Sequence, residues 1–213
     1  MKRWKEALVL LIGLSPAIAA LLMYDRLPDT MASHFGVNNE VNGTMSKNMS
    51  ILMFALLGLV PSILRVVRRL DPKRDNYEKF PVAYEVIRLG AGLLVVAAGW
   101  MVLLFNLGYE LDIRKLALIA IGLLFIVTGN YMTQVQHNYM IGIRTPWTLA
   151  SEEVWRRTHR LGGPLFMIGG IVAIAVTLLA GGVAAVFASL AAIAIVSLIP
   201  VVYSYVIYTR LKA

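Results

Sequence analysis

The chain has 213 residues, no cysteine and a formal net charge of +8. The absence of cysteine excludes disulfides, cysteine-ligated zinc and thiol catalysis. Hydrophobic residues make up 59% of the chain and the mean hydropathy is +0.72, whereas soluble domains are about 45–50% apolar. The excess is concentrated in blocks close to the roughly 20 residues that cross a bilayer as a helix. The sequence therefore predicts an integral membrane protein.

Apolar blocks follow one another along the chain, and each is predicted to be a helix because a membrane span must satisfy its backbone hydrogen bonds internally. The first block follows basic residues and contains small residues, as a secretory signal does. Its apolar run continues through Met23, which favours a first membrane span instead. The predicted fold is an all-α bundle of six transmembrane helices, at about residues 7–24, 49–64, 89–107, 116–132, 165–180 and 183–208.

The distribution of lysine and arginine predicts how these spans are oriented. Among the 20 Lys and Arg residues, all but four lie in segments that share one side of the membrane when the spans alternate. Lys and Arg flanking a span favour the cytoplasmic side, so both termini are predicted to be cytoplasmic. The same distribution explains the net positive charge without nucleic-acid binding. The four exceptions are Arg26, Lys47, Arg114 and Lys115.

Three parts are expected along the chain. Residues 1–64 form a two-span unit with an extracellular loop at 25–48, residues 65–88 form a basic cytoplasmic loop, and residues 89–213 form a four-span unit with a cytoplasmic segment at 131–163. In the outer loop, Asn42-Gly43 predicts a tight turn, and the isolated His34 is weak support for a metal site. At the end of the basic loop, Glu85 and Arg88 are spaced to pair on one helix face.

The densest polar passage of the second half is residues 129–164, between two long apolar runs. Thr148 or Ser151 is expected to cap a short basic helix that carries Trp155 and lies at the membrane interface. Glu152 is expected to pair with Arg156, and Glu153 with Arg157, at i, i+4 spacing. Gly162 and Gly163 are predicted to end this helix, and Pro164 to begin the next span.

No established catalytic motif is present, so we assign no catalytic residue, cofactor or metal. Two alternatives stay open. A metal-dependent membrane enzyme would use His137, His159 and the pair Glu152 and Glu153. A transporter would need a hydrated cavity lined by residues such as Asn106, Asn130 and Tyr203, although the spans carry no charged residue near their centres.

Two stretches of sequence resemble a known family. The run IGIRTPWTLASEEVWRRTHRLGG, residues 141–163, is similar to the SdpI family of bacterial immunity proteins. The run LPDTMASHFGVNNEVNGTMSK, residues 27–47, is similar to an N-terminal domain often fused to that family. It departs from the usual pattern at Asn38, Asn39 and Asn42.

The resemblance implies a protein of the bacterial cytoplasmic membrane that protects its host against a secreted, membrane-active toxic peptide. In some members it implies signalling as well, through capture of a small repressor at the membrane. Toxin would meet the outer loop around His34 and Phe35 or the spans themselves. The partner-binding surface on the cytoplasmic side would involve Asn138, Tyr139, Arg144, Thr145, Pro146, Trp147, Glu152, Glu153, Trp155 and Arg156.

Overall fold

A computed structural model describes residues 3–212. Lys2, one of the charges behind the predicted orientation, lies outside them. Within this range, six helical stretches are long and apolar enough to cross a membrane, and this confirms the predicted bundle. The helices are α1 (Arg3–Leu22), α2 (Lys47–Gly58) with α3 (Val60–Val67), α4 (Pro81–Asn106), α5 (Ile113–Met132), α7 (Glu152–Leu179) and α8 (Gly182–Lys212).

The second span is divided between α2 and α3. Pro61 lies in the first turn of α3, where a missing backbone N–H is tolerated, and the two helices meet around Leu59. Pro16, Pro164 and Pro200 lie inside α1, α7 and α8 without ending them. A membrane helix accommodates such prolines because neighbouring groups take over the freed backbone partners.

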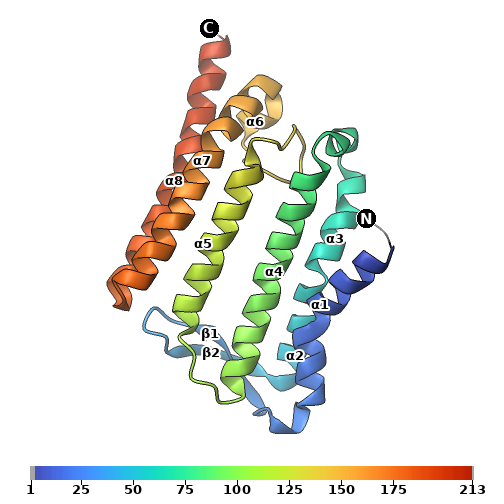
Figure 1. Cartoon of the computed structure of the whole chain (residues 1–213), viewed down its shortest axis with the longest axis vertical. Helices are drawn as coiled ribbons and strands as arrows, with labels where there is room; N and C mark the ends of the chain where they lie inside the picture. The colour runs from blue at the N-terminus through green and yellow to red at the C-terminus, as the bar shows by residue number, and fades with distance from the viewer. Residues whose placement is uncertain (1–2, 213) are drawn as a thin grey trace.

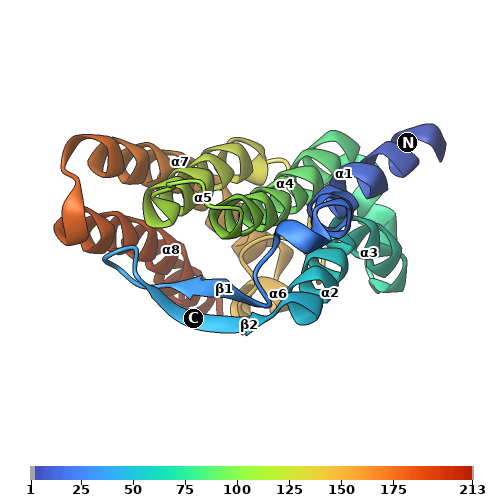
Figure 2. The same ribbon diagram turned by 90° about the horizontal axis from the view of Figure 1, so that it is seen from below.

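The remaining elements lie at the two ends of the bundle (Figure 1). At one end are a short turn, η1 (Tyr24–Arg26), and a hairpin of two antiparallel strands, β1 (Thr30–Phe35) and β2 (Val41–Ser46). At the other end are the turns η2 (Arg68–Leu70) and η3 (Arg74–Lys79) and the short helix α6 (Pro146–Ala150). Figure 2 shows α7, α5, α4 and α1 in one row, with the hairpin lying across the end of the bundle between α8 and α2.

The hairpin is the main element that the sequence did not predict, and its turn is not where we expected it. Gly43 lies inside β2, opposite His34, so the predicted turn at Asn42-Gly43 is wrong. The chain reverses at residues 36–40, where Asn39 adopts a positive φ of 64°. Asn tolerates this left-handed conformation better than most residues because its short polar side chain bonds locally.

Two asparagines attach the hairpin to the helices. The Asn106 side chain accepts from the backbone N–H of Ala32 at 2.7 Å and donates to the carbonyl of Ala32 at 3.0 Å, as a neighbouring strand would. The Asn39 carbonyl accepts from the N–H of Ile113 at 2.9 Å, at the start of α5. The hairpin is therefore hydrogen-bonded to the end of α4 and to the start of α5.

The most extensive helix packing is between α5 and α7, and it explains why the glycine pair does not end a helix. A Cβ at Gly129 would lie 2.6 Å from the carbonyl oxygen of Gly163, and one at Gly170 would lie 2.4 Å from that of Gly122. Small residues let membrane helices approach to backbone contact. The expected stop at Gly162 and Gly163 is wrong because α7 continues through both glycines, which form part of its packing face.

A buried ion network joins α1, α3 and α4. The Arg88 side chain is fully buried and pairs with Glu85 at 2.6 Å, as the sequence predicted, and also with Glu6 at 2.9 Å. Its guanidinium donates to the carbonyl of Pro61 at 2.8 Å. Arg65 approaches the same Glu6 carboxylate at 2.8 Å and is partly exposed. This network fixes the first three spans to one another near the α6 end.

Candidate functional site

The polar residues singled out in the sequence lie at the end of the bundle opposite the hairpin. We call this region the cap: residues 68–80, residues 133–151 and the first three turns of α7. It closes the bundle between α4 and α8, with α6 above the helix ends (Figure 1). Its buried polar side chains are Asp71, His137, Asn138, Thr145, Thr148, Thr158 and His159.

Asn138 organises the loop that leads into the cap. Its carbonyl accepts from the backbone N–H groups of Met140 at 2.8 Å and Ile141 at 2.7 Å. Its amide donates to the carbonyls of Gln136 at 2.8 Å and Ile141 at 3.0 Å. A buried asparagine satisfied in this way holds a tight turn that the backbone alone would not form.

The carboxylate of Asp71 joins the two sequence-distant parts of the cap. It accepts from the Tyr77 hydroxyl at 2.7 Å, from the N–H of Lys73 at 2.8 Å and from the N–H of Tyr139 at 2.9 Å. Burial and the neighbouring Asp71 raise the pKa of Tyr77 far above its usual range, so its hydroxyl stays protonated and donates. Asn76 adds a second link by donating to the carbonyl of His137 at 2.8 Å. Residues 71–77 and 137–139 therefore form a clasp.

Gly142 lets the loop approach the start of α7. Its φ is +117°, and a Cβ at this position would lie 2.4 Å from Nε2 of His159. The next residue, Ile143, donates its N–H to that Nε2 at 3.0 Å, and Nδ1 of His159 lies 2.9 Å from the carbonyl of Trp155. These bonds require the proton on Nδ1, so His159 is neutral and acts as a structural acceptor.

Trp155 lies between the two histidines of the cap. Its ring stacks on His159 at a centroid distance of 4.0 Å and lies 5.1 Å from His137. Its indole N–H donates to the carbonyl of Val135 at 2.8 Å. The side chain is 2% exposed and packs inside the protein beneath the loop. The sequence had suggested that Trp155 faces the membrane interface, and its burial corrects that expectation.

The short helix between the fourth and fifth spans is α6, not the basic stretch after residue 151. Thr145 and Thr148 cap α6 reciprocally, and the Thr145 hydroxyl lies 3.0 Å from that of Ser204 on α8. Trp147 packs against Tyr205 at a ring distance of 5.0 Å. Ser151 caps the N-terminus of α7, accepting from the N–H of Val154. The cap is thus attached to α8 as well as to α7.

Charged side chains complete the cap. Lys73 lies 2.6 Å from Nδ1 of His137 and 2.9 Å from Glu152, whose carboxylate is 3.5 Å from the same histidine. The expected pair of Glu152 with Arg156 is wrong, because Glu152 turns to Lys73. Glu153 pairs with Arg157, as predicted, and also with Arg156.

The pH dependence of stability should report the burial of His137. Burial, and then Lys73, lower the pKa of His137 below its ordinary value. The unfolded chain therefore binds a proton more readily, and stability present above a pH of about 6.5 is lost as the pH falls below it. In detergent micelles, the thermal unfolding temperature of the wild type should fall further between pH 7.5 and pH 5.5 than that of His137→Gln.

His34→Gln serves as the matched control for this measurement, because His34 is exposed and lies at the other end of the molecule. Its unfolding temperature should follow that of the wild type across the pH range. If the unfolding temperatures of the wild type and His137→Gln change with pH in parallel, the lowered pKa of His137 does not contribute to the pH dependence of stability.

The predicted partner-binding residues divide by exposure. Tyr139, Arg144, Pro146, Glu152 and Arg156 are exposed, and Trp147 and Glu153 are half-buried. Three others are buried and shape the cap from within, namely Asn138, Thr145 and Trp155. His34 and Phe35 lie on β1 at the opposite end, where His34 contacts Asn42 and Phe35 packs edge-on against Phe105.

Neither alternative chemistry gains a geometric basis. Within residues 3–212, no group of three or more His, Asp or Glu side chains is arranged to hold a metal ion. Trp155 separates the rings of His137 and His159, and the Asn106 side chain is taken up by the hairpin. The sequence did not single out Asp71, Lys73, Asn76 or Tyr77. The only signal was that carboxylates, Asp71 among them, interrupt a mainly basic loop.

Fold and site together define a multi-pass helical membrane protein with a hydrogen-bonded cap at one end and a β-hairpin at the other. The resemblance to the SdpI family is confirmed: residues 134–204, which contain most of the cap with α7 and much of α8, match the SdpI/YfhL protein family. Residues 11–59, which contain the hairpin, match a domain of unknown function, DUF1648.

The chain is also similar to a characterised bacterial protein. It is 23% identical over 168 residues to the immunity protein SdpI of Bacillus subtilis (strain 168), and the alignment covers 79% of each chain. No solved structure matches the chain significantly.

Proposed function

We propose that this protein is a non-enzymatic immunity protein of the bacterial cytoplasmic membrane, with both termini in the cytoplasm, that protects its host against a secreted membrane-active peptide. The observation that carries the proposal is the similarity to immunity protein SdpI, which extends over most of both chains. The two family matches support it as well, because one covers the hairpin, within residues 11–59, and the other covers most of the cap, within residues 134–204.

The cap's construction supports a binding role. Most of its buried polar groups are satisfied by other groups of the cap, as in the bonds of Asn138 and Asp71. These contacts hold the cap loop in one shape. Among the outward side chains of the cap are the exposed Tyr139, Arg144 and Arg156 and the half-buried Trp147. Aromatic residues and arginine are enriched where proteins bind one another. We assign capture of a small repressor to this surface and contact with toxin to the hairpin and spans.

Survival of a sensitive host tests the proposal. A Bacillus subtilis strain that lacks its own SdpI is transformed with this protein and challenged with the peptide toxin of that species. The wild type should restore growth, and an unrelated membrane protein with the same epitope tag should not. If the wild type accumulates in the membrane and gives no protection against this or any related peptide, the immunity proposal fails.

Two variants separate protection from signalling. Arg144→Ala and Trp147→Ala change the outward surface of the cap and leave its buried hydrogen bonds through Asn138 and Asp71 in place. We expect both to protect against toxin and to lose toxin-dependent retention of a fluorescently labelled repressor at the membrane. Full retention of the repressor in both variants would contradict its assignment to this surface.

A further inference from the structure

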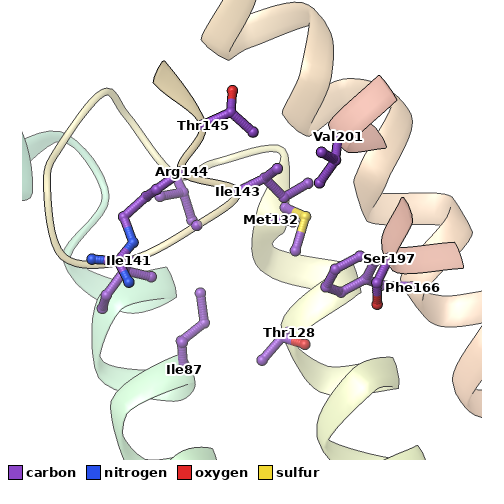
Figure 3. Close-up of a pocket in the computed structure, with 12 residues that line it drawn as sticks. Ile87, Thr128, Met132, Ile141, Ile143, Arg144, Thr145, Phe166, Ser197 and Val201 are labelled. Carbon is purple, nitrogen blue, oxygen red and sulfur yellow. The ribbon is translucent and has the colours of Figure 1, made fainter. Parts of the chain in front are cut away.

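An apolar cavity lies directly under the cap. Its volume is about 370 Å³, within the ~300–1,000 Å³ of ligand pockets. Side chains of α4, α5, α7, α8 and the cap loop line it, as Figure 3 shows. Ile87 of α4 and Val201 of α8 lie on opposite walls, with Thr128 and Met132 of α5 and Phe166 of α7 between them. The cap loop provides Ile141, Ile143 and Arg144 as its roof.

The lining favours an apolar occupant. Three hydroxyl groups border the cavity, and each already has a partner inside the protein. Thr128 donates to a carbonyl of its own helix at 2.7 Å, Ser197 does the same at 2.8 Å, and Thr145 bonds Ser204 at 3.0 Å. A polar molecule would lose its hydration here without gaining hydrogen bonds. A hydrocarbon chain would lose nothing.

Arg144 is the one charged residue on the lining. Its side chain reaches from the loop past Ile141 (Figure 3), and it is exposed. The structure gives its guanidinium a hydrogen bond to the carbonyl of Tyr139 at 2.8 Å, and no carboxylate of residues 3–212 forms an ion pair with it. A guanidinium has five N–H donors in a planar fork that matches a phosphate.

The walls of the cavity and the Arg144 side chain lie at different depths in the bundle. Ile87 lies six residues inside the first residue of α4, about 9 Å at 1.5 Å per residue. The wall of the cavity therefore belongs to the apolar spans, while Arg144 lies in the loop that joins two of them. A ligand that joins an apolar chain to an anion fits this arrangement.

We propose that the cavity holds an acyl chain of an anionic phospholipid whose phosphate is bound by Arg144. The lipid would tie the cap loop to α4 and α8, which lie on opposite sides of the cavity. The basic composition of this end of the protein, with Arg68, Arg69 and Arg74 nearby in the cap, increases the local concentration of such lipids. The proposal concerns lipid binding alone and does not depend on the immunity function.

Native mass spectrometry of the purified full chain tests this directly. The protein in detergent is titrated with phosphatidylglycerol, with phosphatidylcholine of the same acyl chains, and with glycerol phosphate as a headgroup without chains. The wild type should bind phosphatidylglycerol about five- to tenfold more tightly than phosphatidylcholine, since a charge-assisted contact at a membrane surface is worth about that factor. It should bind glycerol phosphate weakly or not at all.

Matched variants identify the site. Arg144→Gln should abolish the preference, Arg144→Lys should keep most of it, and Arg160→Gln, which removes an equal charge from an exposed position of α7, should leave it unchanged. Val201→Phe should weaken the binding of both lipids, because the larger side chain fills the cavity. Ile87→Phe fills it from the opposite wall and replaces Val201→Phe if that protein is not monodisperse. Equal preference in Arg144→Gln and the wild type, or undiminished binding in a well-folded filled variant, would overturn the proposal.

Discussion

Arg88→Met should be among the most destabilising single substitutions in this chain. Arg88 is fully buried and pairs with both Glu6 and Glu85, so its loss removes this partner from the partly buried Glu85 and leaves Glu6 with Arg65 alone. Breaking a buried ion pair from one side costs about 3–5 kcal/mol. We expect that decrease in the free energy of unfolding, measured by denaturant titration in detergent micelles.

Arg65→Met provides the comparison, because Arg65 contacts the same Glu6 carboxylate from a partly exposed position. Its loss should cost less than about 1 kcal/mol. Adding Glu6→Gln and Glu85→Gln to Arg88→Met should recover part of the lost stability, because neutral amides replace carboxylates that have lost the Arg88 charge. If the triple variant is no more stable than Arg88→Met, the ion network is not the source of the effect.

Trp155→Ala is the second substitution with a large expected effect. The side chain is buried, stacks on His159 and bonds the carbonyl of Val135. Removing a buried aromatic residue costs about 3–5 kcal/mol because a cavity is left behind. The cap should open first, so hydrogen–deuterium exchange should rise in residues 135–145 before it rises in the helices.

Trp155→Phe separates the ring from its hydrogen bond. It keeps an aromatic contact with His159 and leaves the Val135 carbonyl without its donor, which costs about 1–3 kcal/mol. It should therefore be intermediate between the wild type and Trp155→Ala. Wild-type exchange rates at residues 135–145 in Trp155→Ala would show that this side chain does not hold the loop.

The bundle could be predicted from the sequence because membrane spans are specified by length and apolarity alone. The glycines could not be interpreted in the same way. In soluble helices a Gly-Gly-Pro sequence marks an end, whereas Gly163 and Gly129 here serve backbone contact between α5 and α7. That role depends on a neighbouring helix, and the sequence does not state which helix it is.

The cap was located correctly but only partly understood. Its loop stood out because Asn138, Gly142 and Trp155 are unusual beside long apolar runs. The partners of that loop, Asp71 and Tyr77, lie more than 60 residues earlier in a stretch that looked like topology control. A hydrogen bond between distant segments leaves no periodic pattern in the sequence. The hairpin was missed for a similar reason, because Asn106, which bonds the backbone of β1, lies about 70 residues further along the chain.

The clasp between Asp71 and Tyr139 has a consequence for how the chain can be divided. If the chain is cut between α4 and α5, the first fragment loses the Tyr139 N–H that donates to Asp71. The second fragment is left with that N–H and without its acceptor. Each fragment alone would therefore carry an unsatisfied polar group, and we expect it to be degraded by quality-control proteases. Co-expressed, they carry complementary surfaces, so the protein is suited to reassembly from two pieces.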